Sequence, residues 1–223
     1  MRTANGHRII AAIAVILALS GCDLQVDGDG STKVNGSVHI PAGKAADEAR
    51  TVNGSIHVDD NAAVTSAVTV NGSIRLGEHA TAASAKTVNG GITLGAGSHV
   101  SESAGSVNGD LTLANGADVA GHLSNVNGRI GMTGAHVGGG IKTVNGSISI
   151  LGASHVEGGI MVDKPSGIMF MNEDPVIVIG PGSVVQGDLR FERKVKLYVS
   201  DKATIGTVIG ATPVPFSGEN PPN

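Results

Sequence analysis

The chain has little aromatic bulk and little charge. It contains no Trp, and only four of its 223 residues are Phe or Tyr. Charged residues make up 15% of the chain, where a soluble protein usually has about 25%. Helical and α/β domains normally build their cores from Leu and aromatic side chains, so this composition argues against both classes. A formal net charge of −4 provides no basic surface for nucleic acid, and we expect no nucleic-acid partner.

Glycine, by contrast, is abundant. The 34 Gly residues are about twice the usual share. A collagen triple helix needs Gly at every third position, and that period is absent. Sustained disorder is disfavoured because 40% of the residues are hydrophobic and the net charge is small. A chain rich in Gly, Val and Ile and poor in bulky side chains is typical of a repetitive β architecture.

Cysteine occurs once, as Cys22, so it has no disulfide partner in the chain. It follows an apolar run over residues 9–19 that Arg2 and Arg8 precede. This run suits a secretory signal and is shorter than the roughly 20 residues of a membrane-spanning helix. The segment Leu19-Ser20-Gly21-Cys22 resembles a bacterial lipobox, which implies that Cys22 becomes the first mature residue and carries acyl chains. The alternative is an ordinary secretory signal with a chance cysteine.

Acyl chains on Cys22 would bind the protein to a membrane, since each buried CH₂ contributes about 0.8 kcal/mol. The expected location is the bacterial cell envelope, on a membrane surface that faces the periplasm. Asp23 resembles the signal that retains lipoproteins on the inner membrane of enteric bacteria. Because that rule varies between lineages, the choice between inner and outer membrane stays open.

One tripeptide, Val-Asn-Gly, recurs through most of the remaining chain. Its successive copies lie 18, 18, 18, 19, 19 and 18 residues apart. The asparagines are Asn35, Asn53, Asn71, Asn89, Asn108, Asn127 and Asn145. A nearly constant period of this length indicates stacked structural repeats.

Aliphatic residues occupy fixed positions around each Asn, at −1, +3 and +5. Polar or small residues stand between the +3 and +5 positions, which predicts a strand with one buried face. We expect all three columns to point inward. The −1 column consists of Val34, Val52, Val70, Val88, Val107, Val126 and Val144.

A second strand is predicted in the other half of each repeat. Its pattern of a small residue, Val, Gly and an aliphatic residue at alternate positions is clear over 117–123, 135–141, 154–160 and 183–189. A degraded copy spans 203–209. One repeat is too short to bury its own aliphatic row, whereas stacked coils about 4.8 Å apart would bury it. The sequence therefore predicts an all-β fold, a single-stranded parallel β-helix (β-solenoid) of roughly 18-residue coils, about nine in number.

The same periodicity divides the chain. Residues 1–21 are the predicted lipoprotein signal peptide, and 22–33 are the lipidated cysteine and a polar tether. The solenoid is expected over 34–211, with an inserted loop at 163–175 where two prolines interrupt the period. Residues 212–223 contain four Pro and are expected to form a flexible tail.

Two columns of polar residues are candidate sites. The Asn column is interpreted as structural, because Asn-Gly suits a bend and stacked carboxamides can form a hydrogen-bonded ladder; recognition of an external molecule is the alternative. The second column is the outward row His99, Asp118, His136 and His155. These side chains are suitable Zn²⁺ or Cu²⁺ ligands, but parallel side chains converge poorly. The favoured interpretation is a solvated polar row, with no metal and no cofactor.

The motifs resemble those of two families. The Val-Asn-Gly-x-Ile rhythm resembles adhesin-like β-strand-repeat families of bacterial envelopes, and residues 178–189 resemble the coils of bactofilins, polymer-forming cytoskeletal proteins. The resemblance covers roughly residues 34–210 and implies a stacked β-helix. If polymers form, it also implies end-to-end contact of terminal coils.

No catalytic site is predicted. Polysaccharide hydrolysis needs two carboxylates placed around a sugar, and the 19 acidic residues are scattered along the repeats. We therefore expect a non-catalytic, lipid-anchored envelope protein that serves as a scaffold or spacer, with self-association as an option. The alternative is an adhesin-like binding module for envelope polysaccharide or a partner protein.

Overall fold

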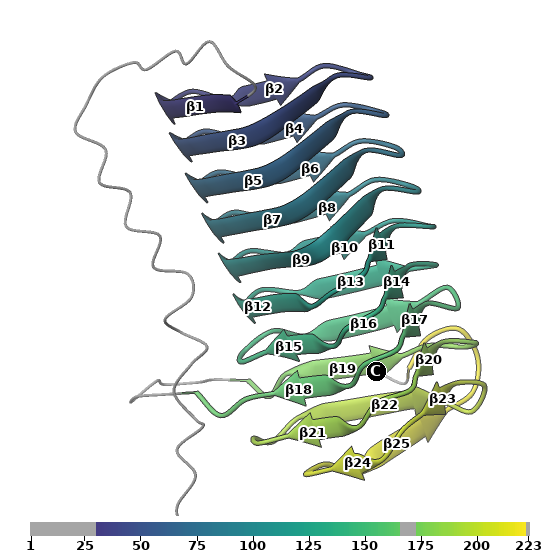
Figure 1. Cartoon of the computed structure of the whole chain (residues 1–223). Coiled ribbons are helices and arrows are strands. Elements are labelled where there is room, and N and C mark those ends of the chain that lie inside the picture. The colour runs from purple at the N-terminus through teal and green to yellow at the C-terminus, as the bar shows by residue number, and fades with distance from the viewer. Residues whose placement is uncertain (1–29, 166–172, 222–223) are drawn as a thin grey trace, which may run out of the picture.

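The computed structural model describes residues 30–165 and 173–221. Within these ranges the chain is all-β and winds into a parallel solenoid with coils about 18 residues apart (Figure 1). This confirms the predicted fold class. The predicted signal peptide, Cys22 and most of the tether lie outside the described residues, as do residues 166–172 of the predicted insertion.

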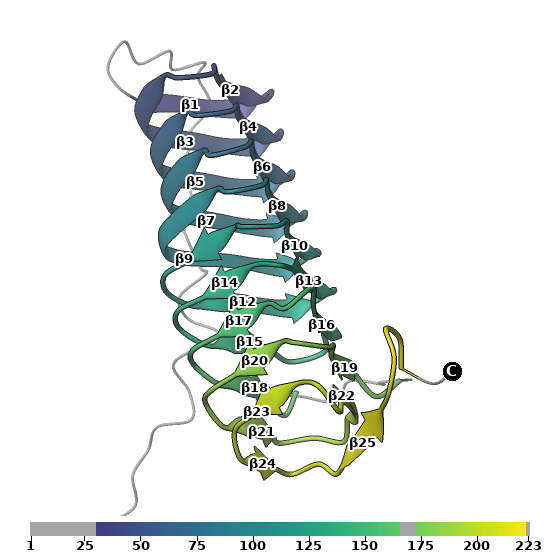
Figure 2. The same cartoon turned by 90° about the vertical axis from the view of Figure 1, so that its right-hand side faces the viewer.

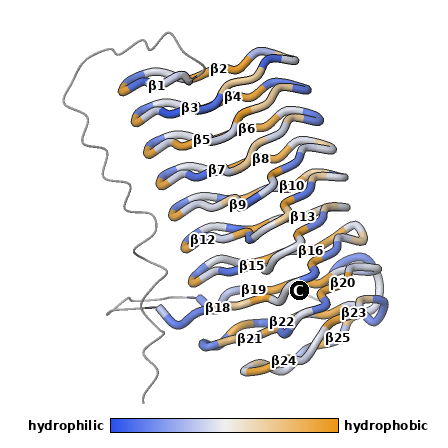
Figure 3. Tube along the Cα trace, viewed as in Figure 1, coloured by the Kyte–Doolittle hydropathy of each residue, from blue (hydrophilic) through white to orange (hydrophobic). Residues whose placement is uncertain are grey.

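One side of the solenoid is a ten-stranded sheet in which every neighbouring pair is parallel. Its register aligns the +3 and +5 aliphatic columns from coil to coil, as in the pairing of Leu111 with Ile92 and Ile130. These columns are buried, and the hydrophobic positions recur in each coil (Figure 3). The strands are β2 (Val38–Ile40), β4 (Ile56–Val58), β6 (Ile74–Leu76), β8 (Ile92–Leu94), β10 (Leu111–Leu113), β13 (Ile130–Thr133), β16 (Ile148–Leu151), β19 (Val176–Ile179), β22 (Lys196–Ser200) and β25 (Pro213–Phe216).

The remaining strands form a fifteen-stranded sheet whose shape changes along the molecule (Figure 2). In the N-terminal half each coil contributes one strand: β1 (Gly30–Asn35), β3 (Ala45–Asn53), β5 (Ala63–Asn71), β7 (Thr81–Asn89) and β9 (His99–Asn108). In the C-terminal half each coil contributes two shorter strands. They are β11 (Asp118–Val119) with β12 (Leu123–Asn127), β14 (His136–Val137) with β15 (Ile141–Thr143), β17 (His155–Val156) with β18 (Ile160–Val162), β20 (Val184–Val185) with β21 (Leu189–Phe191), and β23 (Thr204–Ile205) with β24 (Val208–Ile209).

A single additional residue produces this change. The pairing of β7 with β9 shifts register between Ala82 and Ser84, where β9 contains one more residue than β7. The next coils keep the extra residue. In those coils a column of glycines, which includes Gly121, Gly139 and Gly158, lies at the corner between the two short strands. A Cβ atom at Gly121 would overlap the carbonyl oxygen of Glu102, and one at Gly158 would overlap that of Gly139. The corner therefore requires glycine for close approach of neighbouring coils.

The interior also changes at this point. Ala85 and Ala104 are paired across β7 and β9, and Ala104 is paired with Leu123 of the next coil. Small Ala side chains fill this column in the N-terminal half, and Leu or Ile fills it in the C-terminal half. The buried series is Ala49, Ala67, Ala85, Ala104, Leu123, Ile141, Ile160 and Leu189. A curved single strand thus covers a thinner core, and two strands at an angle cover a thicker one.

The valine column at −1 does not point inward as the sequence pattern predicts. These valines are only partly buried. From the second coil onward the residues before them are buried instead, among them Thr51, Thr69 and Thr87. The chain turns at each Asn-Gly pair, so the alternation of one strand does not continue into the next. The buried hydroxyls are satisfied across coils, since Thr51 Oγ1 donates to the carbonyl of Gly36 at 2.9 Å.

The C-terminal segment also differs from the prediction. Pro213–Phe216, expected in a flexible tail, form β25 beside β22 and make a tenth coil where about nine were expected. The Asp201 amide donates to the Phe216 carbonyl at 3.0 Å. Because backbone groups alternate along a strand, the N–H and C=O groups of Val214 and Phe216 face β22, and the nitrogens of both prolines face the open edge. Proline suits an edge strand because it has no N–H there. In the last coil Val208, rather than Ile209, aligns with the inward Leu189.

Candidate functional site

The predicted polar row lies along one outer surface of the solenoid. Asp118 is paired with His99 in the coil before it and with His136 in the coil after it, and His136 is paired with His155. All four side chains are partly exposed. The residues that follow each of them are buried valines, so strand alternation turns the row outward.

Asp118 accepts a hydrogen bond from each neighbouring imidazole. The distance from His99 Nδ1 to Asp118 Oδ2 is 2.6 Å, and His136 Nδ1 contacts Asp118 Oδ1. A carboxylate can only accept, so both imidazoles carry a proton on Nδ1. The row is therefore a connected chain of contacts and not a set of independent side chains.

Two residues that the sequence analysis did not select extend this chain. Glu157 Oε1 lies 3.3 Å from His136 Nε2, and the Gln186 side-chain amide donates to His155 Nε2 at 3.0 Å. The rings of His136 and His155 lie 5.7 Å apart between centroids. Glu157 and Gln186 each stand one position after an inward Val, so the same alternation that located the row could have located them.

The environment of His136 favours its protonated form. The hydrogen bond to Asp118 is the main reason that the pKa of His136 is raised above 6.5, burial opposes it, and the Asp118 charge and Glu157 add to it. Only an imidazolium can donate from both nitrogens, and His136 faces a carboxylate at each of them. When His136 is protonated, its imidazolium lies between two carboxylates near the middle of the row.

The row does not converge on a metal centre. Among residues 30–165 and 173–221, no group of three or more His, Cys, Asp or Glu side chains is arranged to hold an ion. His99 and His136 both direct Nδ1 at Asp118, so their Nε2 atoms point away from each other. The donors and acceptors of the row are spaced by the coil repeat, and its hydrogen bonds are interrupted between His136 and His155, which make a ring contact.

The Asn column forms a continuous side-chain ladder. In each step the Nδ2 of one Asn donates to the Oδ1 of the Asn in the preceding coil, at 2.7–3.0 Å, from Asn53 on Asn35 to Asn145 on Asn127. Arg193 ends the ladder, because its Nη1 donates to Asn145 Oδ1 at 2.9 Å. Arg193 Nη2 also donates to the carbonyl of Glu173 at 3.3 Å, which links the ladder to the second end of the inserted segment.

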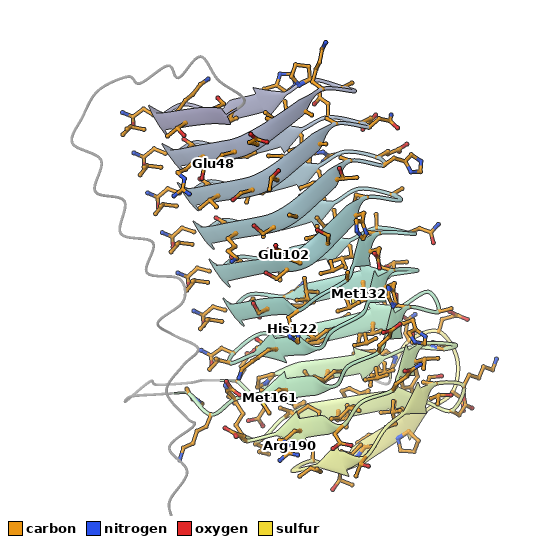
Figure 4. All side chains as sticks on the ribbon, viewed as in Figure 1. Glu48, Glu102, His122, Met132, Met161 and Arg190 are labelled. Atoms are coloured by element: carbon orange, nitrogen blue, oxygen red, sulfur yellow. The ribbon has the colours of Figure 1, made fainter. Side chains whose placement is uncertain are left out.

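Two surface hollows lie on the N-terminal half. One, of about 380 Å³, runs across β3, β5, β7 and β9, has mostly Ala and Thr walls, and reaches His99. The other, of about 580 Å³, lies beside the ten-stranded sheet and includes His57, Asp59, Asp60, Arg75 and Glu78. Glu102 and His122 stand outside both hollows, on the surface where β9 gives way to β12 (Figure 4).

Comparison with known proteins gives no relative for this chain. No family model, no curated protein and no solved structure matches it. In the described part of the chain, no helix has the length and apolar character needed to cross a lipid bilayer.

Proposed function

We propose that the protein is a non-catalytic, lipid-anchored spacer or scaffold of the bacterial cell envelope. The observation that supports this most strongly is the unbroken stacking of coils, in which one ten-stranded parallel sheet extends from β2 to β25. Ten coils about 4.8 Å apart make a body on the order of 45 Å long. Aliphatic columns inside and the Asn ladder outside hold successive coils in register, as a rigid spacer requires.

The lipobox resemblance supplies the proposed anchor. The predicted tether leads into β1, whose only partner among the described strands is β3, so β1 lies at one end of the described stack. Acyl chains on Cys22 would therefore attach one end of the rod to the membrane surface, and the C-terminal coil would lie at the other end. In this proposal the protein holds a fixed distance between the membrane and whatever contacts that coil.

The anchor is tested with the full chain and a Cys22→Ser variant, using membrane fractionation and mass analysis of the mature N-terminus. We expect an acylated Cys22 in the membrane fraction and release of the variant into the soluble fraction. Ser20→Ala, which keeps a small residue in the lipobox, is the matched control and should remain in the membrane fraction. An unmodified Cys22 in a soluble wild-type chain would refute the anchor.

A binding module is the second candidate. It is favoured by the polar row that begins at His99, in the wall of the 380 Å³ hollow, and continues to His155 and its partner Gln186. Such a module should be retained on isolated cell-wall material and remain monomeric by light scattering. A spacer should not be retained. The proline nitrogens on the open edge of β25 offer no N–H for strand addition, which favours a monomer or a small oligomer in either case.

A further inference from the structure

Eight Asn-Gly pairs lie in the described residues, seven in the ladder and one at Asn115-Gly116. Asn-Gly is chemically reactive. The backbone nitrogen of the glycine can attack the side-chain Cγ of the asparagine, and glycine has no side chain to obstruct the attack. Whether a given pair reacts in the folded protein depends on what its glycine nitrogen contacts.

The glycine nitrogen is occupied in most of these pairs. It donates to the main-chain carbonyl of the Asn one coil further on, as Gly36 does to Asn53 at 2.9 Å and Gly109 does to Asn127 at 3.0 Å. The same bond is made by Gly54, Gly72 and Gly90. Attack would require this hydrogen bond to break, so the solenoid protects these pairs. Gly116 donates to the carbonyl of Gly134 at 2.7 Å, and Gly146 donates to Thr143 Oγ1 at 2.9 Å.

Gly128 is the exception. In the described chain its nitrogen donates to no acceptor, since the bond that Gly109 makes to the Asn127 carbonyl has no counterpart between Gly128 and the Asn145 carbonyl. The same step contains the buried Asn125, whose side-chain nitrogen and oxygen both lack partners. Asn145 Nδ2 donates to Asn127 Oδ1 at 2.8 Å, and this bond is common to all the ladder steps, so the free Gly128 nitrogen is what distinguishes Asn127.

We propose that Asn127 is a site of spontaneous deamidation, with water as the co-reactant. Gly128 N loses its proton to water and bonds Asn127 Cγ, while the Cγ–Nδ2 bond breaks and Nδ2 takes up a proton and leaves as ammonia. Water then adds to either carbonyl of the succinimide ring. Cleavage of that ring C–N bond leaves aspartate or isoaspartate at position 127.

This reaction cuts the Asn ladder. Asn127 Nδ2 normally donates to Asn108 Oδ1 at 2.7 Å. A carboxylate at position 127 has no hydrogen to donate, so it would place an oxygen anion against the Asn108 oxygen. Reaction at this step would therefore separate the five ladder residues before it from the one after it.

The test incubates the purified full chain in mildly alkaline buffer at 37 °C and measures conversion at every Asn-Gly pair by peptide mass spectrometry. A parallel sample is fully denatured. We expect Asn127 to react at least about fivefold faster than Asn89 or Asn108 in the folded chain, the factor corresponding to one ordinary hydrogen bond. In the denatured chain the eight pairs of the described residues should react at comparable rates.

Each other outcome overturns the proposal. If Asn127 is no faster than Asn108 when folded, the free Gly128 nitrogen has no effect. If Asn127 leads by the same factor in the denatured chain, the neighbouring sequence and not the fold is responsible. As a variant check, Asn127→Gln should abolish most conversion in the folded chain, because a longer side chain disfavours ring closure, whereas the matched variant Asn108→Gln should leave the total almost unchanged.

Discussion

The two halves of the solenoid reach the same coil stacking with different cross-sections. Before β9, one curved strand lies across an interior lined by Ala; after β9, two short strands meet at a glycine corner over Leu and Ile. The ten-stranded sheet on the other side continues through both halves without a break. One wall of the solenoid thus sets the register, and the other wall adapts to the size of the side chains that it encloses.

The largest expected effect comes from exchanging core residues between the halves. Leu123→Ala removes a fully buried side chain and should lower the free energy of unfolding by about 2–5 kcal/mol. The reciprocal Ala85→Leu should lower it by about 1–3 kcal/mol through overpacking. Both values come from urea unfolding. Val126→Ala, at a partly exposed position, is the control and should have a much smaller effect; equal losses in all three would contradict the proposed difference in core thickness.

The glycine corner gives the next largest effect. A Cβ atom at Gly158 would overlap backbone atoms of Gly139, whereas one at Gly131 meets nothing within 4 Å. Gly158→Ala should therefore lower the free energy of unfolding, measured by thermal denaturation, by about 2 kcal/mol. Gly131→Ala should change it by less than about 1 kcal/mol. A harmless Gly158→Ala would show that the corner is not closely packed.

A stabilising change is expected at the boundary between the halves. Asn125 occupies a column that holds Thr or Ser in the four preceding coils, and its buried amide atoms have no partner in the described chain. Asn125→Thr should raise the unfolding free energy by about 1 kcal/mol, because a hydroxyl can donate to a carbonyl as Thr87 does to Gly72. Thr87→Asn, the opposite exchange in a regular coil, should lower it. Loss of stability in Asn125→Thr would mean that Asn125 is satisfied in solution.

The smallest effect is the pH dependence of the polar row, which lies mainly on the C-terminal half. The pKa of His136 is raised in the folded state, so protonation of His136 stabilises the fold. This contribution to the free energy of unfolding is fully present below the pKa of the unfolded chain, about 6.5, and is lost as pH rises through the folded pKa. Its side chain is 39% exposed, so solvent screening keeps the effect small. Stability measured across this range should decline less in His136→Gln than in wild type. An identical decline in both chains would assign the pH dependence elsewhere.

The repeat itself was predictable from the sequence. The period, the +3 and +5 aliphatic columns and the outward His99–His155 row all follow from spacing and alternation, and the Asn ladder follows from identical side chains in register. The −1 valines were misplaced because alternation does not continue through a turn. The two cross-sections were not predicted. The Asn spacing rises from 18 to 19 residues between Asn89 and Asn108, which marks the additional residue in β9, but the spacing alone does not show where in the coil that residue lies. The pairing of β25 was hidden by its prolines, which indicate a tail unless the orientation of their nitrogens is known.

In-register stacking can be tested directly with two thiols on the outer surface of the ten-stranded sheet. In a Cys22→Ser background, Thr93→Cys with Thr112→Cys places pyrene labels on residues that are paired across β8 and β10. The control pairs Thr93→Cys with Tyr198→Cys, five coils away and separated by roughly 24 Å. The account predicts strong excimer fluorescence from the first pair and monomer fluorescence from the second. Monomer fluorescence from both, or equal excimer fluorescence from both, would contradict the stacking of successive coils.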